Sequence, residues 1–194
     1  MFMNHIFLSA SIPAKERDVK YFETMDVLAI REAVRALTSV VIPKSILVWG
    51  GHPAITPIIK TVADNLSIDC KEHLILYQSD WFRGLFPQEN ESFQKVIYTQ
   101  KKSTKIESLQ EMRKRMIEDY DYKAGIFIGG MDGVEKEFEA FSTAHAKAKL
   151  LPIASTGAAA KIIYEKQKNL FGEELETELT YMHLFKSLLQ GIIE

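Results

Sequence analysis

Short runs of apolar residues alternate along this chain with longer segments in which apolar residues recur at helical spacing. The short runs are bounded by turn residues and predict strands at residues 6–9, 46–49, 73–77, 95–98, 124–128 and 150–154. Most of them are nearly continuous in Ile, Leu, Val and Phe rather than alternating with polar residues. This pattern is typical of strands that are covered on both faces, as in a parallel sheet.

The longer segments predict helices at residues 25–40, 54–66, 103–120, 133–148, 157–168 and 174–190. Strands and helices in alternation indicate βαβ crossovers, in which each helix connects two parallel strands. We therefore expect an α/β fold, a Rossmann-like three-layer sandwich whose mainly parallel sheet carries helices on both faces. The sequence contains no repeat, low-complexity tract or linker, so we expect a single domain over residues 1–194.

Composition limits the partners that such a domain can have. The chain is 46% hydrophobic and 26% charged, with a formal net charge of −2, which is typical of a soluble globular protein. That charge argues against broad binding to nucleic acid or acidic membranes. No apolar stretch approaches the length of a membrane span, and the apolar run near the N-terminus is too short for a signal peptide. We expect a cytoplasmic protein that does not insert into membranes.

The chain contains a single cysteine, Cys70. One cysteine excludes an internal disulfide and supplies no metal cluster. We expect Cys70 to be a small buried residue, and the sequence predicts neither a metal site nor a cofactor.

Turns rich in glycine or hydroxyl residues follow several of the predicted strands. In a parallel sheet the carboxyl ends of the strands lie at one edge, so these turns converge there. The helices that follow offer unpaired N–H groups, which favour phosphate, and glycine lets a ligand approach the backbone closely. The first such turn comprises Gly50, Gly51, His52 and Pro53. Pro53 suits a first helical position, and His52 either donates to a phosphate or ribose or merely caps the helix.

The second turn is the strongest candidate, since it joins a pronounced strand pattern to a pronounced helix pattern. It consists of Gly129, Gly130, Met131, Asp132 and Gly133. We expect Glu137, early in the following helix, to face whatever binds at the sheet edge. The alternative is that Glu135, Glu137 and Glu139 form a solvated helix face favoured by the helix dipole.

A third turn and the end of the first strand carry hydroxyl groups. Ser155 and Thr156 follow the last predicted strand, where they either contact a ligand or form an ordinary helix N-cap. Ser9 and Ser11 end the first strand and could reach the same edge.

Two further segments leave alternatives open. Residues 78–92 are polar and irregular but contain Trp81, Phe82, Leu85 and Phe86, which could form a lid, an oligomer contact or a self-packed loop. The C-terminal helix has apolar residues over more than a narrow stripe, so either core packing or burial in a homo-oligomer accounts for it. These apolar residues are Leu179, Met182, Leu184, Phe185, Leu188 and Leu189.

Arg113-Lys114 on a helix, followed by the stretch GIFIGGMDGVEKEF, resembles the signature of the lysine-decarboxylase-like Lonely guy proteins. Those proteins are phosphoribohydrolases that release cytokinin bases from nucleoside monophosphates. In that family an Arg-Lys pair precedes a strand and a PGGxGTxxE turn, whose glycines hold the phosphate, while the arginine and glutamate act at the ribose. The resemblance assigns these two roles to Arg113 and Glu137, which match by order and approximate spacing.

This chain also departs from that signature. Ile128 replaces the proline, one extra residue stands inside the glycine turn, and Val134 replaces the threonine. The combination FLSAS, WGGHPAITP and FIGGMDGVEKEF is more similar to another branch of the same superfamily, the SLOG grouping of bacterial conflict systems, which includes the sensor domain of Thoeris defence effectors. That resemblance implies recognition of a nucleotide or of an NAD-derived signal such as a cyclic ADP-ribose.

Two functions follow, and the sequence leaves open whether the chain is an enzyme. The first is a module that binds a nucleotide or ADP-ribose-like messenger, with a homo-oligomer or a separate effector protein providing the output. The second is an N-glycosidase acting on nucleoside 5′-monophosphates, with Arg113 and Glu137 as catalytic residues. A third alternative is a scaffold that keeps the fold but has lost its ligand.

Overall fold

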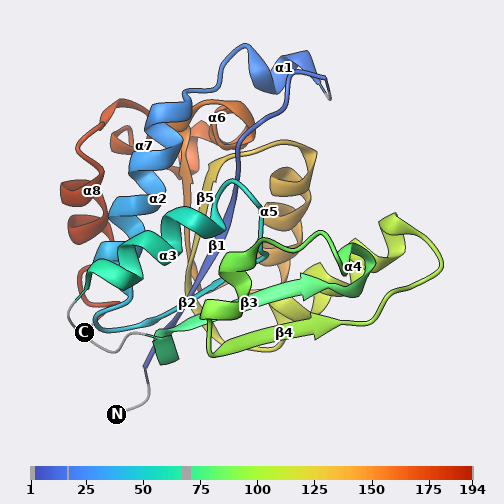
Figure 1. Cartoon of the computed structure of the whole chain (residues 1–194). Coiled ribbons are helices and arrows are strands. Elements are labelled where there is room, and N and C mark those ends of the chain that lie inside the picture. Colours follow the sequence, from blue (N-terminus) through green and yellow to red (C-terminus); the bar gives the residue numbers. More distant parts are fainter. Residues whose placement is uncertain (1–2, 17, 67–70, 194) are drawn as a thin grey trace.

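The structure, a computed structural model, describes residues 3–16, 18–66 and 71–193 and contains a six-stranded parallel sheet (Figure 1). All five strand pairs are parallel, in the order β4-β3-β2-β1-β5-β6. The strands are β1 (His5–Ser11), β2 (Ile46–Trp49), β3 (Leu74–Ser79), β4 (Lys95–Thr99), β5 (Tyr122–Gly129) and β6 (Lys149–Ile153). Each predicted strand is present, and the predicted fold class is confirmed. Cys70 lies outside the described residues.

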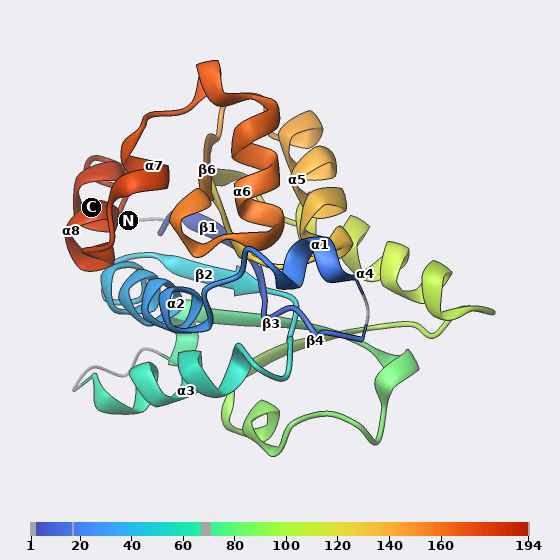
Figure 2. The same cartoon turned by 90° about the horizontal axis from the view of Figure 1, so that it is seen from above.

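Helices form a layer on each face of the sheet, as Figure 2 shows from above. One layer contains α2 (Val27–Val41), α3 (Thr56–Asn65), α7 (Glu174–Thr177) and α8 (Tyr181–Leu188). The other contains α4 (Lys105–Glu118), α5 (Asp132–Ala144) and α6 (Ala158–Lys166), with the short α1 (Val19–Phe22) beside α6. Of the helices in the described ranges, none has both the length and the apolar character needed to cross a bilayer.

The apolar runs are continuous because alternate residues pack into different layers. In β1, Ile6 and Leu8 belong to the core beneath α2, whereas Phe7 belongs to the core beneath α5. Phe7 stacks on Phe141 of α5 with ring centroids 4.8 Å apart. The same alternation recurs in the other central strands, so the sheet is buried on both sides.

Two expectations about helix ends are wrong. Pro53 is not at a first helical position, because the amides of Ile55 and Thr56 bond back to the carbonyl of His52 at 2.9 and 3.0 Å and close a turn there. The helix starts at Thr56, with Pro57 in its first turn. The expected helix over residues 174–190 is two helices, since Glu178 has extended backbone angles and its side chain accepts from the amide of Thr180 at 2.6 Å.

Most of the apolar residues near the C-terminus pack within the chain. Leu184, Phe185 and Leu189 are buried in the core against α2, while Leu179 and Met182 remain exposed. Core packing therefore accounts for most of the broad apolar stripe.

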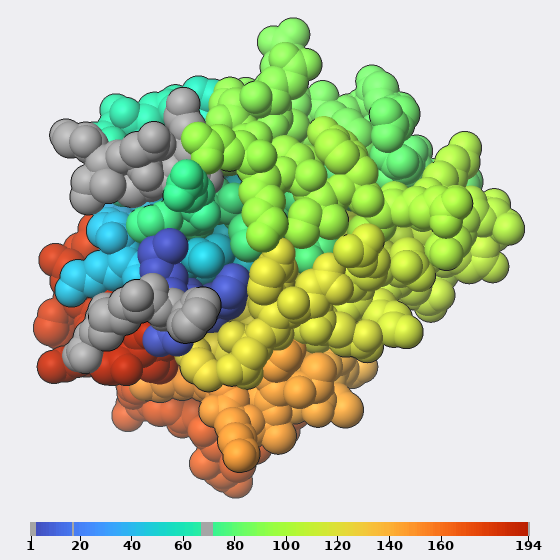
Figure 3. All heavy atoms as spheres, turned by 90° about the horizontal axis from the view of Figure 1, so that it is seen from below, coloured from blue at the N-terminus to red at the C-terminus, as the bar shows by residue number. Residues whose placement is uncertain are grey.

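The strand order reverses at β1. From β1 the chain proceeds through β2 and β3 to β4, then returns to add β5 and β6 on the other side of β1. In open α/β sheets, ligands bind at such a reversal, beyond the carboxyl ends of the strands. Figure 3 shows the opposite end, where the blue start of the chain lies against the yellow segment that precedes β5. There the ring of His5 stacks on Tyr120 with centroids 4.4 Å apart.

Candidate functional site

A cavity of about 680 Å³ opens at the carboxyl ends of the central strands. Its walls come from the ends of β1, β2 and β3, from the first turn of α5 and from one face of α4. The sequence-predicted site residues that line it are Ser9, Ser11, Gly50, Gly51, His52, Arg113, Met131, Asp132, Gly133 and Glu137. The structure thus brings together residues from four segments that are far apart in the sequence.

Ser9, Arg113 and Glu137 form a hydrogen-bonded cluster at the wall of the cavity. Strand alternation places Ser9 on the same face as Phe7, towards α4 and α5. The hydroxyl of Ser9 donates to Oε2 of Glu137 at 2.6 Å, and Nε of Arg113 donates to Oε1 at 3.0 Å. The side chains of Arg113 and Glu137 are 19% and 14% exposed. Each carboxylate oxygen can accept a second bond, so Glu137 is a fixed acceptor for a hydroxyl group.

The Gly129–Gly130 turn is bonded into the surrounding structure. The amide of Gly129 donates to Oγ1 of Thr156 at 2.9 Å, and the amide of Gly130 donates to the carbonyl of Ser11 at 2.8 Å. Neither amide is therefore available to a phosphate. Gly130 has φ +87°, and a Cβ there would lie 2.2 Å from Cγ2 of Val134, so the position requires glycine. The turn sets the direction in which α5 starts, so that its first residues lie at the cavity.

Phosphate-binding capacity lies instead at the first turn of α5. A helix leaves its first amides without intrahelical acceptors, and its dipole favours an anion there. Gly133 occupies such a position at the cavity wall. Lys136, also at the wall, forms an ion pair with Asp132 at 2.9 Å. This pair offsets part of the negative charge that Asp132 places at the helix start.

Gly129, Gly130, Ser155 and Thr156 lie outside the cavity lining. Thr156 is fully buried, and its hydroxyl donates to the carbonyl of Ile153 at 2.6 Å while accepting from Gly129. The hydroxyl of Ser155 pairs with that of Tyr181 at 3.1 Å. In the structure these two hydroxyl groups join segments of the fold to one another.

The turn after β2 closes another side of the cavity. The indole of Trp49 donates to Oγ1 of Thr56 at 3.2 Å and so ties the end of β2 to α3. The amide of Ala54 donates to Nδ1 of His52 at 3.2 Å. Because Nδ1 accepts, a neutral His52 ring carries its proton on Nε2.

Much of the cavity is apolar and was not assigned to the site from the sequence. Its apolar lining includes Phe82, Leu85, Phe86 and Pro87 of the irregular segment and Ile106, Leu109 and Met112 of α4. Of the segment 78–92, Gln78, Phe82, Leu85, Phe86 and Pro87 line the cavity. In the sequence, the feature that could have identified this part of the cavity was the group of aromatic residues in an otherwise polar stretch. Leu85 and Ile106 are 77% and 70% exposed, unusual for large apolar side chains, so the mouth is open on this side.

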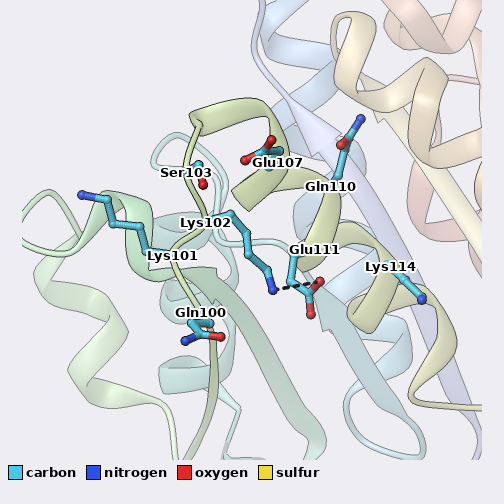
Figure 4. A pocket seen from close by; sticks show the side chains of 8 residues that line it. All are labelled: Gln100, Lys101, Lys102, Ser103, Glu107, Gln110, Glu111 and Lys114. Carbon is cyan, nitrogen blue, oxygen red and sulfur yellow. Dashed lines mark ion pairs between the residues drawn. The ribbon is translucent and has the colours of Figure 1, made fainter.

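A second hollow lies on the outer side of α4 and offers no comparable convergence of side chains. It is lined by Gln100, Lys101, Lys102, Ser103, Glu107, Gln110, Glu111 and Lys114 (Figure 4). Lys102 and Glu111 form an exposed ion pair at 3.7 Å, and Glu107 caps the start of α4. Figure 4 shows Lys101, Gln110 and Lys114 pointing in different directions.

Glu135, one turn from the cavity, connects three helices. Its carboxylate accepts from the hydroxyl of Tyr21 at 2.5 Å and from Nζ of Lys166 at 2.7 Å. Burial opposes ionisation, but these hydrogen bonds and the nearby charge of Lys20 outweigh it, so the pKa of Glu135 is lowered. Glu135 is therefore part of a structural cluster rather than of a purely solvated face.

Comparisons with known proteins agree with this geometry. The model of the SLOG cluster3 family matches residues 20–189, which confirms the resemblance to the SLOG grouping. The X-ray structure of TM1055, a structural genomics target, has a TM-score of 0.54 and 11% sequence identity, with 84% of this chain and 81% of that chain covered. At this identity the likeness shows a shared fold. No curated protein matches the chain significantly.

Proposed function

Because the chain belongs to the SLOG cluster3 family, which indicates a nucleotide-related role, we propose that its cavity binds a nucleotide or an NAD-derived, ADP-ribose-like ligand. The observation that carries this proposal is that one cavity is lined both by polar groups and by large apolar side chains. The polar groups include the Ser9–Arg113–Glu137 cluster. The apolar side chains include those of residues 82–87 and of α4. A nucleotide likewise combines a polar ribose-phosphate with a largely apolar base.

The charges at the wall suit an anionic ligand. Lys105, Arg113 and Lys136 contribute three cationic side chains, against the two carboxylates of Asp132 and Glu137. In our proposal Arg113 and Lys136 attract the phosphate, and the amide of Gly133 in the first turn of α5 donates to it. Glu137 accepts hydrogen bonds from ribose hydroxyl groups, since both of its oxygens are held in place by Ser9 and Arg113.

We favour binding without turnover. The side chain of Val134, which replaces a threonine of the related hydrolases, is buried and packs over Gly130. It offers no hydroxyl to a phosphate beside the turn. The pairing of Arg113 with Glu137 keeps a second function open, an N-glycosidase that releases the base from a nucleoside 5′-monophosphate.

Calorimetric titration with AMP, NAD, ADP-ribose and cyclic ADP-ribose isomers tests the proposal. We expect at least one to bind, and Glu137→Gln to weaken its binding by about tenfold or more. Glu139→Gln is the matched control, because Glu139 is an exposed residue of the same helix. Absence of heat with every ligand would refute binding. Release of free base from AMP that is lost in Glu137→Gln would instead establish the hydrolase.

In the same proposal, the chain acts as a sensor in a bacterial defence system of the Thoeris kind. The basis is the resemblance of its glycine-turn segments to the SLOG grouping of conflict systems, together with its membership of the SLOG cluster3 family. Its output would then pass through a homo-oligomer or through a separate effector protein. Sedimentation velocity with and without the ligand identified by titration distinguishes these two routes.

A further inference from the structure

Gln78 is a buried polar residue at the carboxyl end of β3, and it lines the cavity. It is 5% exposed and follows four apolar residues of the same strand. Burying a carboxamide costs free energy unless its polar atoms find partners. Its hydrogen bonds therefore indicate what this position can recognise.

The neighbouring glycine fixes the orientation of the Gln78 carboxamide. Nε2 of Gln78 donates to the carbonyl of Gly51 at 3.2 Å. Because that carbonyl can only accept, the nitrogen must face it, which settles the assignment of nitrogen and oxygen. A Cβ at residue 51 would lie 2.0 Å from Nε2 and 2.5 Å from Cδ, so the carboxamide packs directly on the glycine backbone.

The oxygen end of the same carboxamide remains for the cavity. Within residues 3–16, 18–66 and 71–193, no group donates a hydrogen bond to Oε1 of Gln78. A ligand that fills the cavity thus meets an oriented acceptor that is shielded from bulk water. Such an acceptor favours an N–H donor and disfavours a carbonyl oxygen.

Gln78 stands at the right place for the base of a nucleotide. It lies on β3, two strands away from Ser9 on β1. Neighbouring strands are about 4.8 Å apart, so β3 and β1 are separated by roughly 10 Å across the sheet. Gln78 lies on the face of Leu76 and Ser9 on the face of Phe7, so the two side chains leave opposite faces of the sheet and both line the cavity at its carboxyl edge. A ligand that contacts both must therefore span the edge of the sheet, as an extended nucleotide can. Phe82 and Phe86 also line the cavity, and aromatic rings of this kind can stack on a base.

Resting on the proposed function, we infer that Oε1 of Gln78 accepts a hydrogen bond from the exocyclic amino group of the base. For an adenine nucleotide this is the 6-amino group. Hypoxanthine differs from adenine by a carbonyl oxygen at that position, which would face Oε1 as a second acceptor. The site therefore selects adenine over hypoxanthine, and Gly51 contributes by leaving room for the carboxamide.

Calorimetric titration with two matched pairs tests this inference: AMP against IMP, and ADP-ribose against its hypoxanthine counterpart. We expect the adenine member of at least one pair to bind about tenfold more tightly or better. If no pair that binds favours its adenine member by more than threefold, the selectivity is refuted while the proposed function stands. If no member of either pair binds, this inference fails, whereas the proposed function fails only if NAD and the cyclic ADP-ribose isomers give no heat either.

Variants assign the selectivity to Gln78. Gln78→Leu should bring the adenine-to-hypoxanthine ratio to about one, and Gly51→Ala should lower it by displacing the carboxamide. Gln110→Leu is the matched control, since Gln110 is an exposed residue outside the cavity lining. If Gln78→Leu does not fold, the adenine-to-hypoxanthine ratios of the wild type and of Gly51→Ala test whether Gln78 determines the selectivity. An unchanged ratio in a folded Gln78→Leu would overturn the assignment.

Discussion

Nε of Arg113 lies 3.0 Å from Oε1 of Glu137, which joins neighbouring helices α4 and α5 at the wall of the cavity. Both side chains are more than four-fifths buried. A charge in such a position is stabilised chiefly by its partner, so the loss of one member leaves the other poorly solvated. The pair is therefore a structural connection as well as a candidate ligand contact.

We expect Arg113→Gln to lower the free energy of unfolding by about 1–3 kcal/mol, because it leaves the Glu137 carboxylate without its cation. The double variant Arg113→Gln/Glu137→Gln should recover part of this loss, since it removes both charges. Urea denaturation of the wild type, both single variants and the double variant gives the interaction free energy between Arg113 and Glu137 as a double-mutant cycle. Strictly additive losses would show that the ion pair contributes nothing to stability.

We expect Gly130→Ala to cost more than Gly84→Ala. Both glycines have similar positive φ values, +87° and +92°, but a Cβ at Gly84 meets open space whereas one at Gly130 meets Val134. Gly84→Ala therefore isolates the backbone cost, about 1 kcal/mol, and Gly130→Ala should exceed it by about 1–3 kcal/mol. Thermal unfolding measures both. Val134→Ala should relieve part of the excess in the double variant, and equal losses at the two glycines would contradict the steric argument.

We expect Thr156→Val to destabilise the fold by about 1–3 kcal/mol, because it leaves the buried amide of Gly129 without an acceptor. Ser155→Ala removes a hydroxyl in the adjacent position and should cost about 1 kcal/mol or less. Ligand affinity, measured by calorimetry below the unfolding temperature, should stay within threefold of wild type in both variants. A tenfold loss of affinity in a folded Thr156→Val would instead make Thr156 a ligand contact.

We expect the stabilising effect of Glu135 to depend on pH. Its pKa is lowered in the folded protein from an ordinary value near 4.5. A lowered pKa means that the stabilisation is fully present above about pH 4.5 and is lost as the pH falls through the folded value. Glu135→Gln should therefore cost roughly 1 kcal/mol at pH 7 and less at pH 3. Urea titrations of this variant and of Glu139→Gln at both values check the trend, and an equal cost at both would contradict it.

We expect the apolar residues of the cavity lining at 82–87 to contact the base. Leu85→Ser should then weaken binding of a nucleotide about fivefold while leaving ribose 5-phosphate unaffected, since that ligand has no base. Leu170→Ser is a matched control, because Leu170 is 75% exposed, compared with 77% for Leu85, and lies outside the cavity lining. Equal weakening of both ligands would show that residues 82–87 act on the whole site rather than on the base.

The fold was predictable because its strands are buried on both faces. Continuous apolar runs such as those of β2 and β5, when they alternate with helical patterns, are typical of a parallel sheet between two helical layers. Helix boundaries were less predictable, since they depend on particular hydrogen bonds. The side chain of Glu178 that ends α7 and the carbonyl of His52 that closes the turn before α3 act locally, without a distinctive sequence pattern.

The site was predictable only in part. Parallel strands bring their carboxyl ends to one edge, so Ser9 and the residues of the glycine turns could be placed together. The sequence could not show that the Gly129 and Gly130 amides bond to segments distant in the chain. Gln78 was assigned to an irregular loop, because a glutamine at the end of an apolar run is indistinguishable from the first residue of a turn.

The Gly129–Gly130 turn is bonded to two segments that are distant in the sequence. Its amides bond to Thr156 and to the carbonyl of Ser11, and its own carbonyl at Gly130 accepts from the amide of Ala159. The polar wall is thus organised before a ligand arrives, and binding costs little conformational entropy there. Leu85, which also lines the cavity, is 77% exposed and follows Gly84, which has φ +92°. Ligands that differ only in their bases should consequently differ mainly in their binding entropy. Ligands that differ only in their phosphates should differ mainly in their binding enthalpy.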